Sequence, residues 1–573
     1  MKLRTFAFAL IACTALGTAA SAAAPGIAVN IRVDPKAHPE PVTGRVFLMI
    51  SRNHDKEPRL MTSYTYAYYF NDPAVTYAPL YGKDVTDLKA GEPVVIDAKT
   101  VGYPFKSLKD FPPGDYSVQA VLNVYTKFAR ADGHVIYAHA DRGEGQQFHL
   151  SPGNLVSEPQ RVTLDPKHGI HLDLKLTRTL PAIPTPADTK YVKRVSFTSK
   201  LISKFWGQDM RFGAIVVLPK GYDEHPDVHY PVVFHQGHWM EGEPFGFVEE
   251  LPPAPAADAS PRAQKHYAQV KALHDAWLSD SMPRFILVSL QHPTPYYDDS
   301  YLANSANNGP WEDALMQEML PFLEAKFRII PNGYARVMFG GSTGGWISAA
   351  LQIHRPNDFG GAWVFCPDPV DFREFVNVDL YADSEAFTAP GYEWTAPERF
   401  MSRSVKGQPR VSVRDFSRVS AVLGSHGRSG EFFDMWSAVY GPVGSDGYPK
   451  LVWDYATGKI DHSVVEYWRS HGFDLREYAE RNWKTIGKSL AGKLHFSTGD
   501  MDNFYLNLAM YRMQDFLVSA DPPYGGSIKF GRPMIGHEFY GYDPWPMAML
   551  DDMAAQIEHN TPPSALPVAW RYK

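Results

Sequence analysis

Residues 336–351 read Arg-Val-Met-Phe-Gly-Gly-Ser-Thr-Gly-Gly-Trp-Ile-Ser-Ala-Ala-Leu, and this stretch decides the fold. Arg336–Phe339 predicts a strand and Gly345–His354 a helix, so the G-x-S-x-G motif between them falls on a strand-to-helix turn. Glycines two positions to either side of Ser342 remove side chains that would clash in such a turn. We therefore predict that Ser342 is an exposed nucleophile. The alternative is a purely structural turn, since Gly- and Ser-rich turns are common.

Strand-like and helical segments alternate on both sides of the motif. The predicted strands are 212–218, 230–234, 284–290, 362–365, 493–497 and 527–530, and a long helix is predicted over 311–327. The strand at 284–290 is apolar throughout, as expected when both faces of a strand are buried. The alternation predicts an α/β fold with a mostly parallel sheet and helices on both faces.

Two aspartates follow the strand at 493–497. A nucleophilic serine in such a fold is followed along the chain by an acid and then a histidine. Asp500 or Asp502 could hold the imidazole in the correct tautomer and stabilise its charged form. Asp502 also precedes a predicted helix at 503–517, so it could simply be an N-cap residue.

His537 follows the strand at 527–530 and is the predicted general base. The chain has 21 histidines, and a single histidine is more often structural than catalytic. His559 is less well placed, because it falls in a predicted terminal helix.

The oxyanion formed during acyl transfer needs two backbone N–H donors. One belongs to Thr343, the residue after the nucleophile, and the other to the loop after the strand at 230–234. In that loop, His235-Gln236-Gly237-His238-Trp239, we predict His238 as the donor, with Gly237 allowing the turn. His235 and His238 could also be ordinary loop residues. No third ligand at metal-site spacing is visible, and no metal is predicted.

The chain has 2 cysteines, Cys13 and Cys366. Cys366 could be a rival nucleophile, but it has no neighbouring histidine in the sequence and ends a buried strand. An inert thiol is therefore predicted.

The first residues have the features of a secretory signal. Lys2 and Arg4 precede an apolar stretch, and Ala20-Ser21-Ala22 is a small-x-small cleavage pattern. We predict a signal peptide over 1–22 and a secreted or periplasmic protein. Anchoring as a lipoprotein at Cys13 is the lesser alternative, because it would leave an unusually short signal.

Between residues 25 and 180 short strand patterns are separated by turn residues, for example at 45–50, 116–122 and 171–176. This spacing predicts a small, immunoglobulin-like β-sandwich. A proline-rich segment over 181–186 then predicts a linker.

Length and charge limit the functional classes. With 573 residues the chain is long enough for two or three domains, and its net charge of −7 gives no reason to expect nucleic acid as a partner. No later stretch approaches the apolar length of a membrane span.

Four segments together resemble the esterase D and enterochelin-esterase-like branch of the α/β hydrolases. They are Tyr230–Val233, Gly340–Trp346, Gly499–Phe504 and Gly536-His537. The resemblance covers roughly residues 190–545 and implies an α/β-hydrolase catalytic domain over 190–573. It also implies that the acid is the second Asp of Gly-Asp-x-Asp, here Asp502, and that the oxyanion donor after Gly237 is His238. Members of this branch often carry an N-terminal β-sandwich.

One departure from a simple fold is an insertion over about 367–490, longer than a connection needs. It is predicted to be a cap or lid, whose Trp436, Trp453 and Trp468 could contact substrate or form the insertion's own core.

The predicted function is a serine carboxylic ester hydrolase acting on a small-molecule or glycan ester, without a cofactor. A serine peptidase and a non-catalytic glycan- or partner-binding protein are the alternatives.

Overall fold

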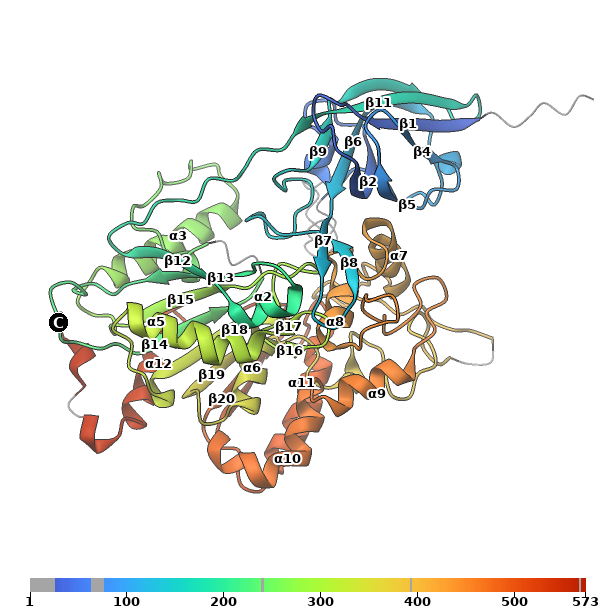
Figure 1. Cartoon of the computed structure of the whole chain (residues 1–573). Coiled ribbons are helices and arrows are strands. Elements are labelled where there is room, and N and C mark those ends of the chain that lie inside the picture. Colours follow the sequence, from blue (N-terminus) through green and yellow to red (C-terminus); the bar gives the residue numbers. More distant parts are fainter. Residues whose placement is uncertain (1–25, 63–76, 239–241, 392–393, 566–567, 573) are drawn as a thin grey trace, which may run out of the picture.

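The computed structural model describes residues 26–62, 77–238, 242–391, 394–565 and 568–572 (Figure 1). The predicted signal peptide with Cys13, and Trp239 of the predicted oxyanion loop, lie outside these ranges. Within them, no helix combines the length and the apolar character needed to cross a membrane.

An eight-stranded sheet forms the centre of the C-terminal part of the chain. From edge to edge it consists of β12 (Val192–Thr198), β13 (Arg211–Val217), β15 (Ile286–Gln291), β14 (Val232–Gln236), β18 (Arg336–Gly341), β19 (Gly361–Phe365), β20 (Leu494–Gly499) and β21 (Ser527–Gly531). β13 runs antiparallel to both of its neighbours, and every pair from β15 to β21 is parallel. The prediction of a mostly parallel, α/β-hydrolase-like sheet is confirmed.

The helices pack on this sheet because their apolar residues are buried against it and so removed from water. α6 (Thr343–His354) contacts β14, β18 and β19, and α10 (Leu475–Leu490) packs on α6. α6 is apolar nearly all the way round and is buried up to Ile353, as expected for a helix covered by a second layer. The other long helices are α3 (Pro261–Trp277), α11 (Leu506–Val518) and α12 (Met547–His559).

The helix predicted over 311–327 is interrupted. The segment starts as α4 (Trp311–Ala314), continues as a π-helical turn over Leu315–Met319 and ends as α5 (Leu320–Lys326). Pro321 lies at the start of α5 and has no backbone N–H to donate to the preceding turn, which explains the change in hydrogen-bonding pattern.

The N-terminal strands pair into one nine-stranded sheet. Its members are β1 (Ile27–Val33), β2 (Val42–Ser51), β3 (Leu80–Leu88), β4 (Pro93–Asp97), β5 (Gly102–Tyr103), β6 (Gly114–Val124), β9 (Leu155–Ser157), β10 (Gln160–Leu164) and β11 (Ile170–Thr179). The strand-rich character agrees with the prediction, but pairing into a single sheet does not confirm a two-sheet sandwich. β7 (Thr126–Ala129) and β8 (Val135–Ala138) form a separate hairpin.

The long insertion follows β19 and contains α7 (Val413–Leu423), α8 (Phe432–Tyr440) and α9 (His462–Ser470). Three of its tryptophans are buried: Phe375 contacts both Trp436 and Trp468, and Phe433 contacts Trp453. These residues form the insertion's own core, which is one of the two roles that the sequence predicted for them.

The N-terminal sheet lies against α7 of the insertion, far from it in sequence (Figure 1). Arg45, on β2, has a buried side chain that donates hydrogen bonds to Val422 O at 2.9 and 2.8 Å and to Ala421 O at 3.1 Å. It also forms an ion pair with Asp84. The Arg45 guanidinium therefore holds the N-terminal sheet against the insertion, because it donates hydrogen bonds to carbonyls at the end of α7 that have no partner within the helix.

Replacing Arg45 is expected to weaken the contact between the N-terminal sheet and α7 and so to destabilise the protein. Arg45→Ala leaves buried carbonyls without donors and Asp84 with only one of its two cations, Arg428, a loss of roughly 2–4 kcal/mol. The thermal unfolding midpoint should fall by several degrees, measured by differential scanning calorimetry. Arg32→Ala is the matched control, because Arg32 pairs with the exposed Asp173 and such surface pairs contribute little. Equal midpoints for the two variants would contradict this role of Arg45.

Candidate active site

Ser342 occupies a strained position between β18 and α6. Its backbone has φ 56° and ψ −121°, a conformation that is uncommon for a residue with a side chain. The flanking glycines are required sterically: a Cβ on Gly340 would lie 2.3 Å from the carbonyl carbon of Gly344, and one on Gly344 would lie 1.9 Å from Gln236 O. The turn therefore has the geometry that the G-x-S-x-G motif predicts, with the 236–238 loop pressed against it.

The segment after β19 wraps around Ser342. The Ser342 N–H donates to Phe365 O at 3.0 Å, and the Asp368 N–H donates to Ser342 O at 3.1 Å. The Ser342 hydroxyl donates to Asp368 Oδ1 at 3.1 Å. Ser342 is half-buried, whereas Asp368 is 4% exposed.

His537 and Asp502 form an ion pair beside this segment. His537 Nδ1 and Asp502 Oδ2 are 2.7 Å apart, and Asp502 is fully buried. Asp502 Oδ1 accepts the N–H groups of Phe504 at 2.8 Å and Leu506 at 3.3 Å. Such bonds fix the carboxylate and leave its other oxygen for the imidazole.

Asp500 has a different partner. Its Oδ1 accepts the Ile535 N–H at 3.1 Å, and it forms no contact with His537 in the described part of the chain. The helix predicted from residue 503 starts only at Leu506, after Tyr505, so Asp502 is not the N-cap residue. His559 is the last residue of α12 and is exposed.

Cys366 lies next to His537, which the sequence did not indicate. Its Sγ is 4.0 Å from His537 Nε2, and its own conformation is strained, with φ 31°. The absence of a nearby histidine in the sequence was therefore a wrong reason for predicting an inert thiol. Ser342 and His537, both among the described residues, share no hydrogen bond, because the serine hydroxyl is directed to Asp368.

The environment of His537 favours its charged form. Burial alone would lower its pKa, but the Cys366 sulfur and the Asp502 carboxylate raise the pKa well above its ordinary value. A base must be neutral to accept a proton, so any reaction that uses His537 should speed up as the pH rises through this pKa.

Cys366→Ala gives a test of this environment. Removing a group that raises the pKa of His537 lowers that pKa, so the acid limb of the pH–rate profile for kcat/KM should move to lower pH. Ester hydrolysis at pH 8 should be retained. Complete loss of hydrolysis in Cys366→Ala would instead identify the cysteine as the nucleophile.

The 236–238 loop brings a second charged pair to the other side of Ser342. His238 Nδ1 lies 2.7 Å from Asp299 Oδ2 and 3.6 Å from Asp298 Oδ1. Burial opposes the charge on His238, but these carboxylates raise its pKa to about 10. The imidazolium therefore donates through both ring nitrogens, with Nε2 bonded to the hydroxyl of Thr343.

This pair also corrects the expectation that no third ligand-type side chain lies near His238. The ligand atoms of His238, Asp298 and Asp299 all lie within 4.8 Å of one another. The hydrogen-bonded ion pair of His238 and Asp299 accounts for this arrangement. His235 is stacked between Phe245 and Phe339, and burial lowers its pKa to about 4, so it is a neutral loop residue.

Both predicted oxyanion donors lie at the turn. Thr343 is the first residue of α6, so its N–H has no partner inside the helix. His238 contacts the Thr343 side chain and follows Gly237, whose nitrogen would lie 2.9 Å from a Cβ on Gly344. The two backbone segments therefore meet beside Ser342, as an oxyanion hole requires.

Two residues of the site, Asp368 and Tyr301, were not predicted, and Trp436 was predicted only as a possible substrate contact. The three form a hydrogen-bonded group in which Trp436 Nε1 donates to the Tyr301 hydroxyl oxygen at 2.8 Å and to Asp368 Oδ2 at 3.2 Å. The Tyr301 hydroxyl donates to the same Oδ2. Asp368 could have been found from the sequence, because it follows β19, the parallel strand beside the nucleophile strand, just as Asp502 follows β20, the next strand of the sheet.

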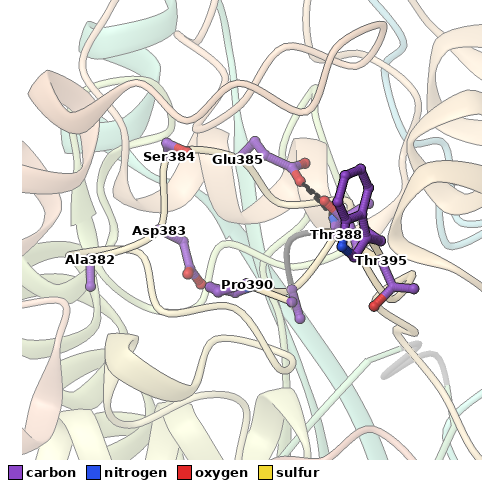
Figure 2. Close-up of a pocket in the computed structure, with 11 residues that line it drawn as sticks. Ala382, Asp383, Ser384, Glu385, Thr388, Pro390 and Thr395 are labelled. Carbon is purple, nitrogen blue, oxygen red and sulfur yellow. Dashed lines mark hydrogen bonds between the residues drawn. The ribbon is translucent and has the colours of Figure 1, made fainter.

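Two cavities lie away from Ser342. The first, of about 590 Å³, is lined by residues 382–385, 388–391 and 394–396 of the insertion, where Glu385 accepts a hydrogen bond from the Thr388 hydroxyl and Trp394 is 86% exposed (Figure 2). The second, of about 820 Å³, is lined by Gly237, Asp298 and Asp299 among others. Only the second touches groups that surround the nucleophile turn.

Comparison with solved structures gave distant likenesses. The chain is similar to a ferulic acid esterase (16% identity, 64% of this chain and 98% of that one, TM-score 0.32). It is also similar to the fluorophosphonate-binding serine hydrolase F of Staphylococcus aureus (13%, 64% and 98%, TM-score 0.31) and to an S-formylglutathione hydrolase of Agrobacterium tumefaciens (10%, 65% and 97%, TM-score 0.32). At such TM-scores these likenesses add nothing to what the sheet topology shows.

A search of curated proteins gave no match. Residues 203–413 match the family described as "Putative esterase", a segment that includes the oxyanion loop, the serine turn and the start of the insertion. Through this segment the chain is similar to the esterases, and the match indicates an enzyme of the hydrolase class.

Proposed function

We propose that the chain is a serine carboxylic ester hydrolase that acts through Ser342, His537 and Asp502. The proposal rests on the strained turn at Ser342 and on the segment after β19 that surrounds it. Cys366 in that segment lies 4.0 Å from the imidazole of His537, and this imidazole is paired with Asp502. A serine on such a turn, a histidine from a neighbouring loop and a buried carboxylate behind that histidine are the parts of a nucleophilic triad.

In the acylation step, Ser342 Oγ attacks the ester carbonyl carbon and His537 Nε2 takes the serine proton. For this the hydroxyl must rotate from Asp368 towards His537. Asp502 stabilises the imidazolium that forms, and the N–H groups of Thr343 and His238 bind the oxyanion. Collapse of the tetrahedral intermediate breaks the ester C–O bond, and the alcohol leaves with the proton from His537.

In the deacylation step, His537 removes a proton from water, and the resulting hydroxide attacks the acyl-serine. The second tetrahedral intermediate releases the carboxylic acid and returns the proton to Ser342. Each step balances without a cofactor.

A residue of the insertion forms hydrogen bonds with the loop that carries Asp502, and this loop in turn bonds to His537. Arg403 Nε donates to Asp502 O at 3.0 Å, and Asn503 donates to Arg403 O at 2.8 Å. Asn503 Oδ1 in turn accepts the His537 N–H at 2.9 Å. We propose that the 367–490 insertion is a cap that orders the acid and base loops and lies over the substrate.

The location and the N-terminal region belong to this proposal as well. The signal pattern over 1–22 supports export, so the substrate would be a periplasmic or extracellular ester. Residues 25–180 would form a separate β-sandwich domain attached through its contact with α7.

Hydrolysis of p-nitrophenyl acetate and p-nitrophenyl butyrate tests the proposal. The purified protein should release p-nitrophenol and the acid in equal amounts, with turnover saturable in ester. It should show no dependence on added metal or on prior treatment with a chelator. Release of p-nitrophenol no faster than in buffer, for both esters at pH 8, would contradict the proposed activity.

A further inference from the structure

Asp368 has hydrogen-bonding capacity left on the side that faces Ser342. Its Oδ2 accepts from Tyr301, from Thr343 Oγ1 at 3.0 Å and from Trp436 Nε1 at 3.2 Å, whereas among the described residues its Oδ1 accepts only from Ser342 at 3.1 Å. An ionised carboxylate can accept about four hydrogen bonds, roughly two at each oxygen. The donors around Oδ2 therefore fix the carboxylate, and the open acceptor position is on Oδ1.

Asp368 also has no cationic partner. It is 4% exposed, and among the described residues its partners are a serine, a threonine, a tyrosine and a tryptophan, with no ion pair to lysine, arginine or histidine. A buried carboxylate without a compensating cation carries a desolvation cost that its neutral partners offset only in part.

The nearest cation in this network, His238, already donates both of its N–H groups to other residues. His238 donates one N–H to Asp299 and the other to Thr343, so it reaches Asp368 only through the threonine hydroxyl. Asp298, Asp299 and Asp368 outnumber this one imidazolium, and the local charge beside Ser342 is negative. Such a centre attracts a cation and repels an anionic acyl group.

The open position on Oδ1 is within reach of the acyl part of an ester. At attack the carbonyl carbon lies about 3 Å from the serine oxygen, and Asp368 Oδ1 lies 3.1 Å from that same oxygen. Both atoms are neighbours of the same oxygen, so a group on the carbon next to the carbonyl can extend to Oδ1 when the acyl chain lies on that side. When it donates there, it replaces the Ser342 hydroxyl, which is then released to bond with His537.

Resting on the proposed function, we propose that Asp368 is a specificity-determining residue that selects esters whose acyl group carries a protonated amine next to the scissile carbonyl, as amino acid esters do. A protonated amine supplies both the hydrogen-bond donor and the positive charge that the site lacks. A hydroxyl would supply only the donor.

The test compares two substrates that differ only in the amine: the p-nitrophenyl esters of L-alanine and of propionate, at pH 6, where an α-amino group is protonated. Each kcat/KM is divided by the rate of spontaneous hydroxide-catalysed hydrolysis, which removes the intrinsic reactivity of the alanine ester. The corrected ratio should favour the alanine ester by about 10- to 100-fold, the range of a hydrogen bond between charged groups.

The variant Asp368→Asn should bring this ratio close to one, since the amide keeps the shape but loses the charge. Glu466→Gln is the matched control. It removes one exposed carboxylate of the same insertion, paired only with Arg469 on the surface, and should leave the ratio at the wild-type value. Thermal midpoints of both variants check that they fold.

Equal corrected rates in the wild type, or a preference that persists in Asp368→Asn, would overturn the proposal while leaving the esterase function in place. If neither ester is hydrolysed at pH 6 or at pH 8, the proposed function fails and the selectivity fails with it.

Discussion

Ser342→Ala is expected to lower kcat/KM for p-nitrophenyl esters by about 10⁴- to 10⁶-fold, the loss typical of removing a nucleophile from a triad. The reason lies in the turn between β18 and α6, where the strained backbone presents this one hydroxyl beside the His537 loop. KM should change little, because the ester is still bound by the cap and the oxyanion loop. Steady-state kinetics of the purified variant measure the effect.

Ser348→Ala provides the control for this substitution. Ser348 lies on the same helix, is buried, and its hydroxyl donates only to Gly344 O at 2.8 Å. It should retain activity within a few-fold of the wild type. A Ser342→Ala enzyme that keeps a tenth or more of wild-type activity would show that another group attacks the ester.

Asp502→Asn is the second substitution with a large expected effect, a fall in kcat of about 10³- to 10⁴-fold. The amide cannot stabilise the imidazolium, and it favours the wrong tautomer of His537 by presenting an N–H where Nδ1–H now donates. Stopped-flow or steady-state assays across pH 6–9 would show the loss at every pH, since a raised pH does not restore the orientation of the ring.

Asp500→Asn separates the two aspartates of the Gly-Asp-x-Asp segment. Asp500 accepts the Ile535 N–H and is not bonded to His537, so its loss should cost less than about tenfold through a small shift of the loop. The opposite ranking, with Asp500→Asn the more damaging, would reassign the acid.

The sequence predicted the parts of the site that depend on chain order. The glycines around Ser342 admit few conformations other than a tight turn, and the strand before it and the helix after it are clear from their apolar periodicity. Because parallel strands end at one edge of the sheet, the loops after β18, β20 and β21 meet there, which brings Asp502 and His537 together.

The sequence could not predict contacts between the insertion and that edge. Trp436 reaches Asp368 from α8, and Tyr301 reaches it from the loop after β15, although neither stands in a motif. The position of Cys366 beside His537 was missed because the two residues are 171 positions apart. Such contacts depend on how an irregular segment folds back, which no periodicity encodes.

The packing of the N-terminal sheet against α7 could not be predicted from the sequence for the same reason. Arg45 pairs with carbonyls of α7 almost 380 positions later, and nothing in the composition of either segment marks them as partners. The interruption of the helix over 311–327, by contrast, could have been read from Pro321.

The central claim is that Ser342 is the nucleophile, and the most direct measurement is to locate the residue that a fluorophosphonate modifies. The wild-type protein is incubated with the probe, digested, and the modified peptide identified by tandem mass spectrometry. We expect stoichiometric modification of Ser342, with labelling abolished in Ser342→Ala and retained in Cys366→Ala. Modification at any other residue, or none in a protein that hydrolyses esters, would contradict it.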